Sequence, residues 1–339
     1  MTLGIVGYGL VSPGGLTPRD HAFFVHSGVL APAPSPFVTR DDERVDVGYC
    51  SWLGAEIPVA ERLQALALTA LRSALSDPDI ASLPPPSLVL VVSPPREGLL
   101  REDVQALRDA AAKTIRADSV AVVFGEAAAF KALAEIDTTL PRDAPAPVVV
   151  LAVDSFVSPG AIDARVRFPP SPWAMDPVVP SEAAAAVAIL RRDVARRARV
   201  EVLGLLRGAA AAQGDSNDEN DLPVDGTAMT AALRALPRSG PFSFAFGQDR
   251  VDSLRKMEWH IATARNASLF DPNYAMWTPE TEIGRVGAAA GLLLLVHGLA
   301  MLRHRTVRGA RAASGAPACA WAISPDGTRG AASFTEGES

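Results

Sequence analysis

The sequence predicts an α/β protein built from a duplicated unit. Apolar runs of strand length lead into stretches with helical spacing of leucine and alanine, as in the strand and helix pair at residues 119–136. The order strand, helix, strand, helix, strand, buried helix, strand, strand occurs twice, which predicts two βαβαβαββ halves at residues 1–198 and 199–339. A chain of 339 residues with 48% hydrophobic content can bury a large core.

Composition excludes several functional classes. The formal net charge of −6 is spread along the chain without a basic stripe, so we expect no nucleic-acid partner. The two cysteines, Cys50 and Cys319, have no CxxC or Cys/His companion, so neither a disulfide framework nor a zinc site is supported. No positive segment precedes the apolar N-terminal run, which therefore does not resemble a signal peptide. We expect a cytoplasmic protein without metal or cofactor.

The first half begins with a buried strand at residues 3–12. Gly7 and Gly9 give a dinucleotide-like pattern, but no helix opens at once and no acidic ribose ligand follows, so the Rossmann fingerprint fails. Residues 16–57 are proline-rich and charged, and we expect irregular surface structure with Phe37 and Trp52 packed onto the core. The remaining predicted elements of this half are a helix at 59–76, a strand at 87–93, a helix at 101–113, a strand at 119–124, a helix at 126–136, a strand at 148–155 and the segment 181–191.

The second half repeats this order. The predicted strands are 200–211, 242–247, 274–278, 318–323 and 331–334, and the predicted helices are 227–236, 251–266 and one that begins at Val286. Residues 286–302 are apolar but fall just short of a membrane span, so we expect a buried core helix and no membrane insertion. The acidic segment 214–225 lacks the Gly and Glu positions of a calcium loop and is predicted to be a solvated loop.

Four short sequence words, in this order, resemble the thiolase superfamily and within it the β-ketoacyl synthases. They are LGIVGYGLVSPGG at 3–15, SEAAAAVAIL at 181–190, GRVGAAAG at 284–291 and SPDGTRGAASF at 324–334. The second is similar to the family word GEGAAVLVL, the third to GHTLGAAG and the fourth to GFGGTNASLVL. The resemblance implies a thiolase-like fold with layered α-β-α-β-α architecture over nearly the whole chain.

The family's reactive positions hold other residues here. Its ACSSSLVAL word falls on residues 125–133, so Glu126 stands where the family has its nucleophilic cysteine. Phe246 and Arg285 fall on the two family histidines, and Glu280 on the family lysine. The family's glycine gate is replaced by Ser324, Pro325 and Asp326. The five histidines of the chain, His21, His26, His260, His297 and His304, all lie elsewhere.

Condensation by this family needs a thiolate and imidazoles that stabilise the enolate and its oxyanion. The resemblance therefore implies a pseudo-ketosynthase without catalytic residues. A carboxylate at residue 126 would compensate a guanidinium at Arg285, so we predict that the two side chains lie within hydrogen-bonding distance. His297 is expected to be a core histidine bonded to backbone or water, and Asp154 with Ser155 a polar strand end.

Two functional hypotheses remain at this point. In the first, the chain is an inactive binding or accessory protein, such as an effector-loading or chaperone-like partner in type VI secretion. In the alternative, it is similar to chain length factors, or decarboxylates malonyl thioesters, as partner of a ketosynthase and acyl carrier protein in fatty acid or polyketide synthesis. Family members pair through the strand before the nucleophile, so we predict a homodimer through residues 119–124, an apolar strand without proline or lysine to protect its edge.

Overall fold

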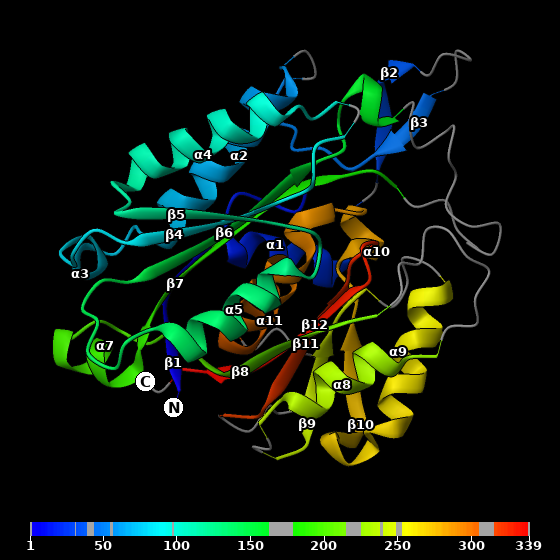
Figure 1. The fold of residues 1–339 in the computed structure, drawn as a ribbon. Helices are drawn as coiled ribbons and strands as arrows, with labels where there is room; N and C mark the ends of the chain where they lie inside the picture. The colour runs from blue at the N-terminus through cyan, green and yellow to red at the C-terminus, as the bar shows by residue number, and fades with distance from the viewer. Residues whose placement is uncertain are drawn as a thin grey trace.

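In the computed structural model the strands of the two halves form one ten-stranded sheet (Figure 1). The structure describes residues 2–30, 32–38, 44–54, 57–96, 98–162, 179–214, 225–237, 240–248, 253–304 and 315–337. The strands that the first half contributes to this sheet are β1 (Leu3–Val11), β4 (Ser87–Val92), β5 (Ser119–Phe124), β6 (Val148–Ser155) and β7 (Glu182–Arg191). Those of the second half are β8 (Gly204–Gln213), β9 (Phe242–Phe246), β10 (Phe270–Trp277), β11 (Ala318–Ile323) and β12 (Thr328–Glu336).

The sheet order shows that the unit is duplicated. It runs β10-β9-β11-β12-β8-β1-β7-β6-β4-β5, so each half has its third strand outermost, followed by its second, fourth, fifth and first strands. In both halves the second strand pairs in parallel with the third and fourth, and the fifth pairs antiparallel with its two neighbours. The halves meet where Leu3–Ile5 of β1 pairs with residues 204–206 of β8. The boundary predicted at residue 198 falls at the end of the short helix α7 (Arg192–Ala198) and stays a prediction.

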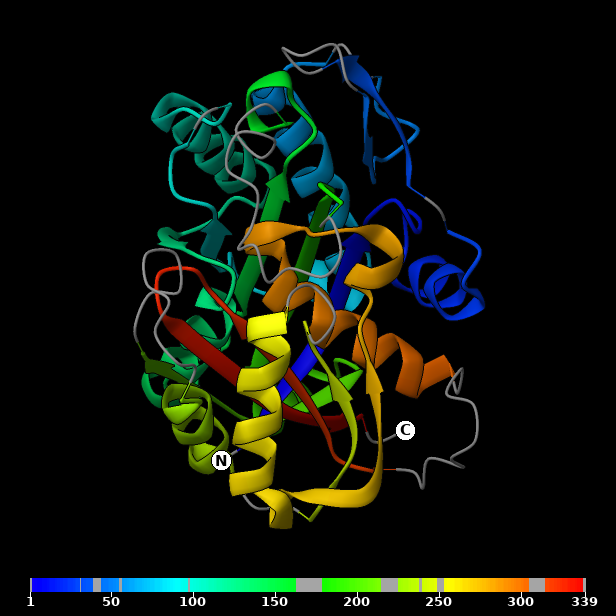
Figure 2. The same ribbon diagram turned by 90° about the vertical axis from the view of Figure 1, so that its right-hand side faces the viewer.

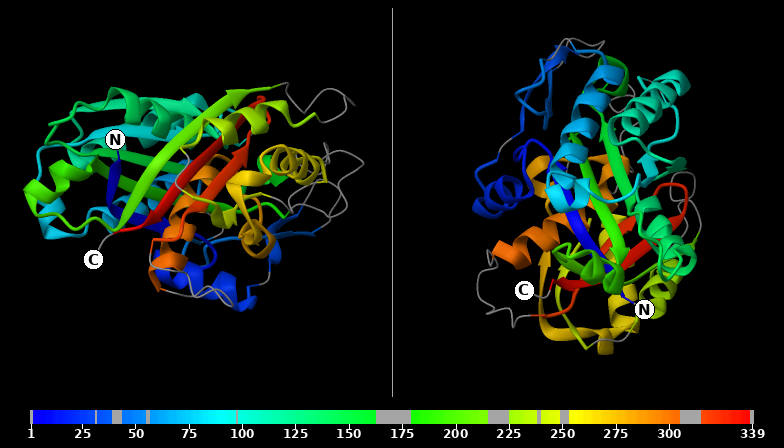
Figure 3. Two further views of the ribbon diagram at one scale, coloured as in Figure 1. Left: turned by 90° about the horizontal axis from the view of Figure 1, so that it is seen from below. Right: turned by 90° about the vertical axis from the view of Figure 1, so that its left-hand side faces the viewer.

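Helices separate and cover the two sets of strands, which gives the expected layered arrangement. On one outer face lie α2 (Val59–Ala74) and α4 (Arg101–Ile115), and on the other lie α8 (Thr227–Ala235) and α9 (Ser253–Arg265). Between the halves lie α5 (Ala128–Thr139) and α11 (Ala290–His304), which contact strands of both (Figures 1 and 3). The two central helices thus bring the middle of the first half against the end of the second.

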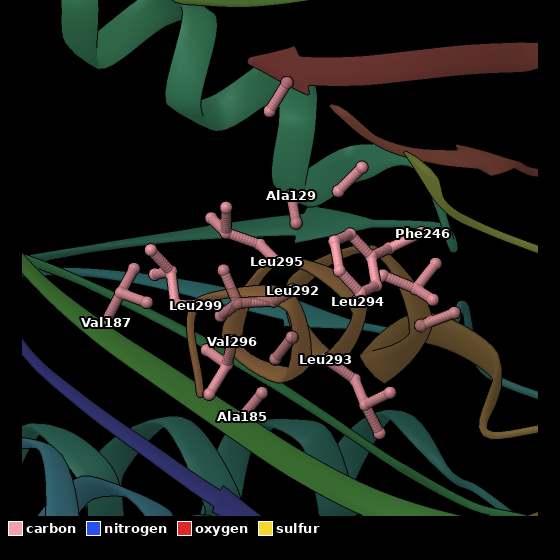
Figure 4. Packing of buried hydrophobic residues seen from close by; sticks show 14 of the residues in the cluster. Ala129, Ala185, Val187, Phe246, Leu292, Leu293, Leu294, Leu295, Val296 and Leu299 are labelled. Atoms are coloured by element: carbon pink, nitrogen blue, oxygen red, sulfur yellow. The ribbon is translucent and has the colours of Figure 1, made fainter. Parts of the chain in front are cut away.

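The apolar helix α11 lies in the centre of the core, as its composition predicts. The stretch Gly287–His304 is apolar enough to cross a membrane, but 89% of it is buried inside the protein. Figure 4 shows its leucines surrounded by side chains such as Ala129 of α5, Val187 of β7 and Phe246 of β9. A helix that is apolar on every side is stabilised here because strands and helices of both halves cover it.

The glycines of β1 have a packing role. A Cβ atom on Gly7 would lie 2.0 Å from the carbonyl oxygen of Ala74, and one on Gly9 would lie 2.1 Å from that of Ala70. Both carbonyls belong to α2, so this helix approaches the strand at a distance that only glycine permits. The pattern that resembles a phosphate-binding turn therefore serves the contact between strand and helix.

The prediction of irregular structure at residues 16–57 is wrong in part. The segment contains helix α1 (Pro18–Ser27) and a two-stranded sheet of β2 (Ala33–Val38) and β3 (Arg44–Val47), seen at the edge of the molecule in Figure 2. Thr17 caps α1, proline occupies its first turn, and Gly28 ends it in the left-handed conformation. Trp52 is 42% exposed and does not pack onto the core as expected. The side chain of Phe37 lies outside the described residues.

Element boundaries shift elsewhere by a few residues. The strand expected at 200–211 begins at Gly204, that at 274–278 begins at Phe270, and the last strand begins at Thr328. Short helices that the sequence did not predict are α3 (Pro78–Ala81), α7, α10 (Glu280–Ile283) and single 3-10 turns at Ala267–Leu269 and Gly287–Ala289. Most of the acidic segment 214–225 lies outside the described residues.

Candidate functional site

Glu126 lies between β5 and α5, where the two halves of the chain meet. Gly125 turns the chain with φ of 118°. The helix expected from residue 126 begins at Ala128, so Glu126 precedes α5 and is not part of its first turn. Its backbone N–H donates to Ser324 Oγ at 3.1 Å, and its carbonyl accepts from the N–H of Gly291 in α11 at 3.3 Å. Both contacts fix this residue of the first half against the second half.

The Glu126 side chain forms the predicted ion pair with Arg285. Arg285 Nε donates to Glu126 Oε1 at 3.1 Å, and a second nitrogen of the guanidinium donates to the same oxygen. The Glu126 side chain is 6% exposed and that of Arg285 is 16% exposed. The prediction that the two lie within hydrogen-bonding distance is thus confirmed. A pair this well shielded from water is stabilised by charge-assisted hydrogen bonds and costs much to break.

Gln248 is a third member of this cluster, and the sequence did not single it out. Its Nε2 donates to Glu126 Oε2 at 3.0 Å, while its Oε1 accepts from the N–H of Ile323 at 2.9 Å. The side chain is fully buried just beyond the end of β9. Its only signal in the sequence is a polar residue shortly after an apolar strand, with Gly247 between the two.

The loop that carries Arg285 is fixed by its backbone. The Arg285 N–H donates to Val179 at 2.8 Å, and its carbonyl accepts from Ser181 at 3.0 Å. Glu280 supports the same loop, because its Oε1 accepts from the N–H of Val286, the residue after Arg285, at 3.1 Å. The position that the resemblance aligns with a family lysine therefore holds a carboxylate that orders the loop after Arg285.

Asp154 supports the same loop from the first half. Its Oδ2 accepts from the N–H of Ala288 at 3.0 Å, and its Oδ1 accepts from Arg96 at 2.7 Å. A Cβ atom on Gly287 would lie 2.1 Å from Asp154 Oδ2, so glycine is required at that position. The strand end that the sequence analysis interpreted as polar thus anchors the turn before α11.

A second buried carboxylate, Glu182, lies next to this anchor. It accepts hydrogen bonds from the backbone N–H of Cys50 at 2.8 Å, from Arg62 at 2.7 Å and from the Ser155 hydroxyl at 2.9 Å. Burial raises the pKa of Glu182, and the charge of Arg62 opposes that rise. Because all these partners are protein groups, Glu182 ties the segment around Cys50 to β7 and serves the fold.

Phe246 lies in the apolar interior. It is fully buried at the end of β9, with its ring centroid 5.8 Å from that of His297 and 6.0 Å from that of Phe334. Figure 4 shows it beside Leu292 and Leu294 of α11. A phenyl ring supplies no proton donor, so this position cannot stabilise an oxyanion.

Two buried histidines, His297 and His21, lie next to one another on one side of Phe246. The rings of His21 and His297 are perpendicular with centroids 5.0 Å apart, and His21 Nδ1 lies 2.6 Å from Ser12 Oγ. Burial lowers the pKa of His21 to about 3 and holds that of His297 well below its ordinary value. The expectation of a core histidine at 297 is met, but neither of its ring nitrogens has a hydrogen-bond partner among the residues that the structure describes.

In the cluster of Glu126, Arg285 and Gln248, two nitrogen-bearing side chains donate hydrogen bonds to one carboxylate. Its carboxylate is engaged by nitrogen donors at both oxygens, and the guanidinium of Arg285 has donors only and no acceptor. Both thiols of the chain are buried, and burial raises the pKa of Cys50 and of Cys319, so neither is a reactive thiolate. Among the described residues, no group of three or more histidine, cysteine, aspartate or glutamate side chains could hold a metal ion.

Comparison with known proteins gives no match by sequence. No protein-family model matches the chain, and no curated protein matches it.

Solved structures match over the full chain. A chain of the AntDE:AntF complex, a type II PKS acyl-carrier protein with its ketosynthase bound to the hexaketide, has a TM-score of 0.77 at 14% identity, with 99% of each chain covered. The ishigamide ketosynthase/chain length factor has a TM-score of 0.74 at 16% identity, with 100% of each chain covered. The ketosynthase from module 6 of the bacillaene synthase from Bacillus subtilis 168 has a TM-score of 0.79 at 15% identity, with 100% of this chain and 72% of that chain covered. The chain therefore has the layered α/β fold of ketosynthases and chain length factors, the thiolase-like fold.

Proposed function

We propose that this chain is a non-condensing partner subunit of a ketosynthase in fatty acid or polyketide synthesis, similar in role to a chain length factor. The observation that carries the proposal is the shielded ion pair between Glu126 and Arg285 at the point where the two halves meet. In the proposed alignment Glu126 occupies the nucleophile position, and Phe246 and Arg285 occupy the positions of the two histidines. The ion pair then fills the place where condensation would occur.

Condensation is disfavoured by the chemistry of these groups. The reaction needs a thiolate that accepts the acyl chain and neutral donors that stabilise the enolate. A carboxylate held by Arg285 and Gln248 is a weak nucleophile, and Phe246 has no donor at all.

Decarboxylation of a malonyl thioester is disfavoured for a related reason. The enolate that forms when carbon dioxide leaves needs a donor whose charge is available to it. The Arg285 guanidinium already donates twice to Glu126, so its charge is largely compensated. We therefore favour a binding role over residual decarboxylation.

The edge of the sheet supports a paired subunit. β5 is the last strand in the sheet order, and among the described strands it pairs with β4 alone. It carries apolar side chains, and Phe124 at its end is 46% exposed. An unprotected apolar edge of this kind favours pairing with another strand, so we propose that a ketosynthase or a second copy of the chain pairs with residues 119–124.

The secretion hypothesis has less support. Two of the three solved structures described above are a ketosynthase assembled with its carrier protein and a ketosynthase/chain length factor, and none of the three concerns secretion. The similarity lies in the fold alone, so partner identity needs its own experiment.

Affinity purification of the tagged full-length chain from its own cells, read by mass spectrometry beside Ala121→Lys, tests the proposal. Ala121 is an exposed residue of β5, and lysine there opposes edge pairing. Ala81→Lys, an exposed change in α3, is the matched control. We expect a ketosynthase with the wild type and with Ala81→Lys, and its loss with Ala121→Lys. Recovery of a secreted toxin without ketosynthase or carrier protein would support the secretion hypothesis and contradict the proposal.

A second assay tests the absence of chemistry. Purified protein is incubated with malonyl coenzyme A, and released carbon dioxide is compared with that from Glu126→Ala and from buffer. We expect no release above buffer for the wild type. Turnover by the wild type that is lost in Glu126→Ala would identify a decarboxylase.

A further inference from the structure

Three N–H groups converge on one carboxylate in the cluster around Glu126. Arg285 donates twice to Oε1, and Gln248 Nε2 donates to Oε2 at 3.0 Å. This is the arrangement of a carboxylate-binding site, in which a guanidinium supplies charge and an amide satisfies the second oxygen. The bound carboxylate belongs to the chain itself.

The donors are held in place without the Glu126 side chain. The Gln248 amide is oriented by the Ile323 N–H on its Oε1 at 2.9 Å. The Arg285 backbone pairs on both sides with residues 179–181, and Glu280 binds the next N–H along the loop. Because these contacts do not involve the carboxylate of Glu126, its removal leaves the donors near their present positions.

The backbone of Glu126 is held separately from its side chain. Ser324 and Gly291 bind its N–H and carbonyl, so a shorter side chain at this position leaves the start of α5 fixed. Replacement by alanine removes one methylene and the carboxylate, which together correspond to acetate. The space left has the size and the donors that acetate requires.

We propose that Arg285 and Gln248 form a preorganised binding site for a small monocarboxylate, and that the Glu126 side chain occupies it in cis. The site accepts free acetate or formate once that side chain is removed. The consequence for function rests on the proposed function: a malonyl group, which carries a free carboxylate, finds the site already filled. The chain is thereby closed to the extender units that an active ketosynthase binds.

Thermal unfolding of Glu126→Ala in sodium acetate, with total ionic strength held constant by sodium chloride at pH 7, tests the site. We expect the variant to melt below the wild type, and acetate to raise its Tm saturably by about 2 °C or more. Formate should act more weakly because it fills less space, and butyrate should not act because it is too large. The wild type should not respond.

Two variants control for general salt effects. Glu126→Ala combined with Arg285→Ala lacks the cationic donor and should not respond to acetate. Ser324→Ala loses the backbone contact of Glu126 but keeps the carboxylate in place, so it should be destabilised without any acetate response. An equal effect of acetate on the double variant, or an equal effect of chloride, overturns the inference.

Refolding provides a second measurement if Glu126→Ala is poorly soluble. The variant is unfolded in urea and diluted into acetate or into chloride of equal strength. A higher soluble yield in acetate is expected, and equal yields overturn the inference. The effect of acetate does not depend on which protein the chain binds. If a ketosynthase is recovered but acetate has no effect on Glu126→Ala, only the binding site is refuted. If acetate acts on Glu126→Ala but the wild type turns over malonyl coenzyme A, only the proposed function is refuted.

Discussion

Replacing Arg285 by methionine should be among the most destabilising single changes at the candidate site. The Glu126 side chain is 6% exposed, and loss of the guanidinium removes both hydrogen bonds that Arg285 donates to its Oε1. Breaking a buried ion pair from one side costs about 3–5 kcal/mol, because the remaining charge stays desolvated. Glu126→Gln leaves Arg285 without the charged carboxylate of Glu126, but Arg285 is 16% exposed and can reach water. The free energy of unfolding should therefore fall by less, about 1.5–3 kcal/mol.

Urea unfolding at pH 7, followed by tryptophan fluorescence, measures the free energies of unfolding of Arg285→Met, of Glu126→Gln and of the variant that carries both changes. The stacked rings of Trp259 and Trp321, with centroids 4.4 Å apart, report on the second half. The double variant should be more stable than the sum of the single costs implies, since the two losses share one interaction. Arg108→Met, in an exposed pair with Asp109, is the matched control and should change stability by less than about 0.5 kcal/mol. If Arg285→Met costs no more than this control, the ion pair is effectively solvated and the closed-site argument fails.

Three further predictions concern packing, pH and assembly. Gly9→Ala should abolish soluble expression because its Cβ would meet an α2 carbonyl at 2.1 Å, whereas Gly28→Ala, with φ of 63° and nothing within 4 Å, should cost only about 1 kcal/mol in urea unfolding. Burial lowers the pKa of His21 to about 3 and holds that of His297 well below its ordinary value, so the unfolded state binds more protons below pH 6.5. Stability should therefore fall as the pH drops below 6.5, by up to about 1.4 kcal/mol per pH unit for each histidine until its folded-state pKa is reached. His297→Leu should reduce this loss in Tm measured between pH 7 and pH 5, and an unchanged pH profile would contradict the assignment. The purified chain should scatter light as a dimer of its 35.5 kDa mass at micromolar concentration, and Ala121→Lys should scatter as the monomer; a wild-type monomer would contradict self-pairing and leave a ketosynthase as the proposed partner of this edge.

The ion pair and Gln248 join segments that are far apart in the sequence. Glu126 follows a strand of the first half, and Arg285 and Gln248 follow elements of the second. Helices α5 and α11 lie side by side between the halves, so the turns that precede them meet at one point. A change that separates the halves should therefore disturb this cluster.

The sequence by itself determined the order and type of the principal elements. Local periodicity placed the strands at 119–124, 148–155 and 318–323 with the bounds that the structure has, and the apolar composition of residues 286–302 predicted a helix covered on all sides. These properties depend on neighbours within a few residues, which the sequence contains. The opposite charges of Glu126 and Arg285, together with a family resemblance, were enough to predict their contact.

Other features were decided only by the tertiary structure. The bonds of Gln248 to Glu126 and to Ile323, the support of the Arg285 loop by Glu280, and the contact of His21 with His297 join residues that no local pattern links. The start of α5 at Ala128 instead of Glu126 has the same cause, because Ser324 and Gly291 bind the backbone of Glu126 and hold it outside the helix. Hydrogen bonds across the two halves depend on how the sheets and central helices pack, and that packing exists only in the folded chain.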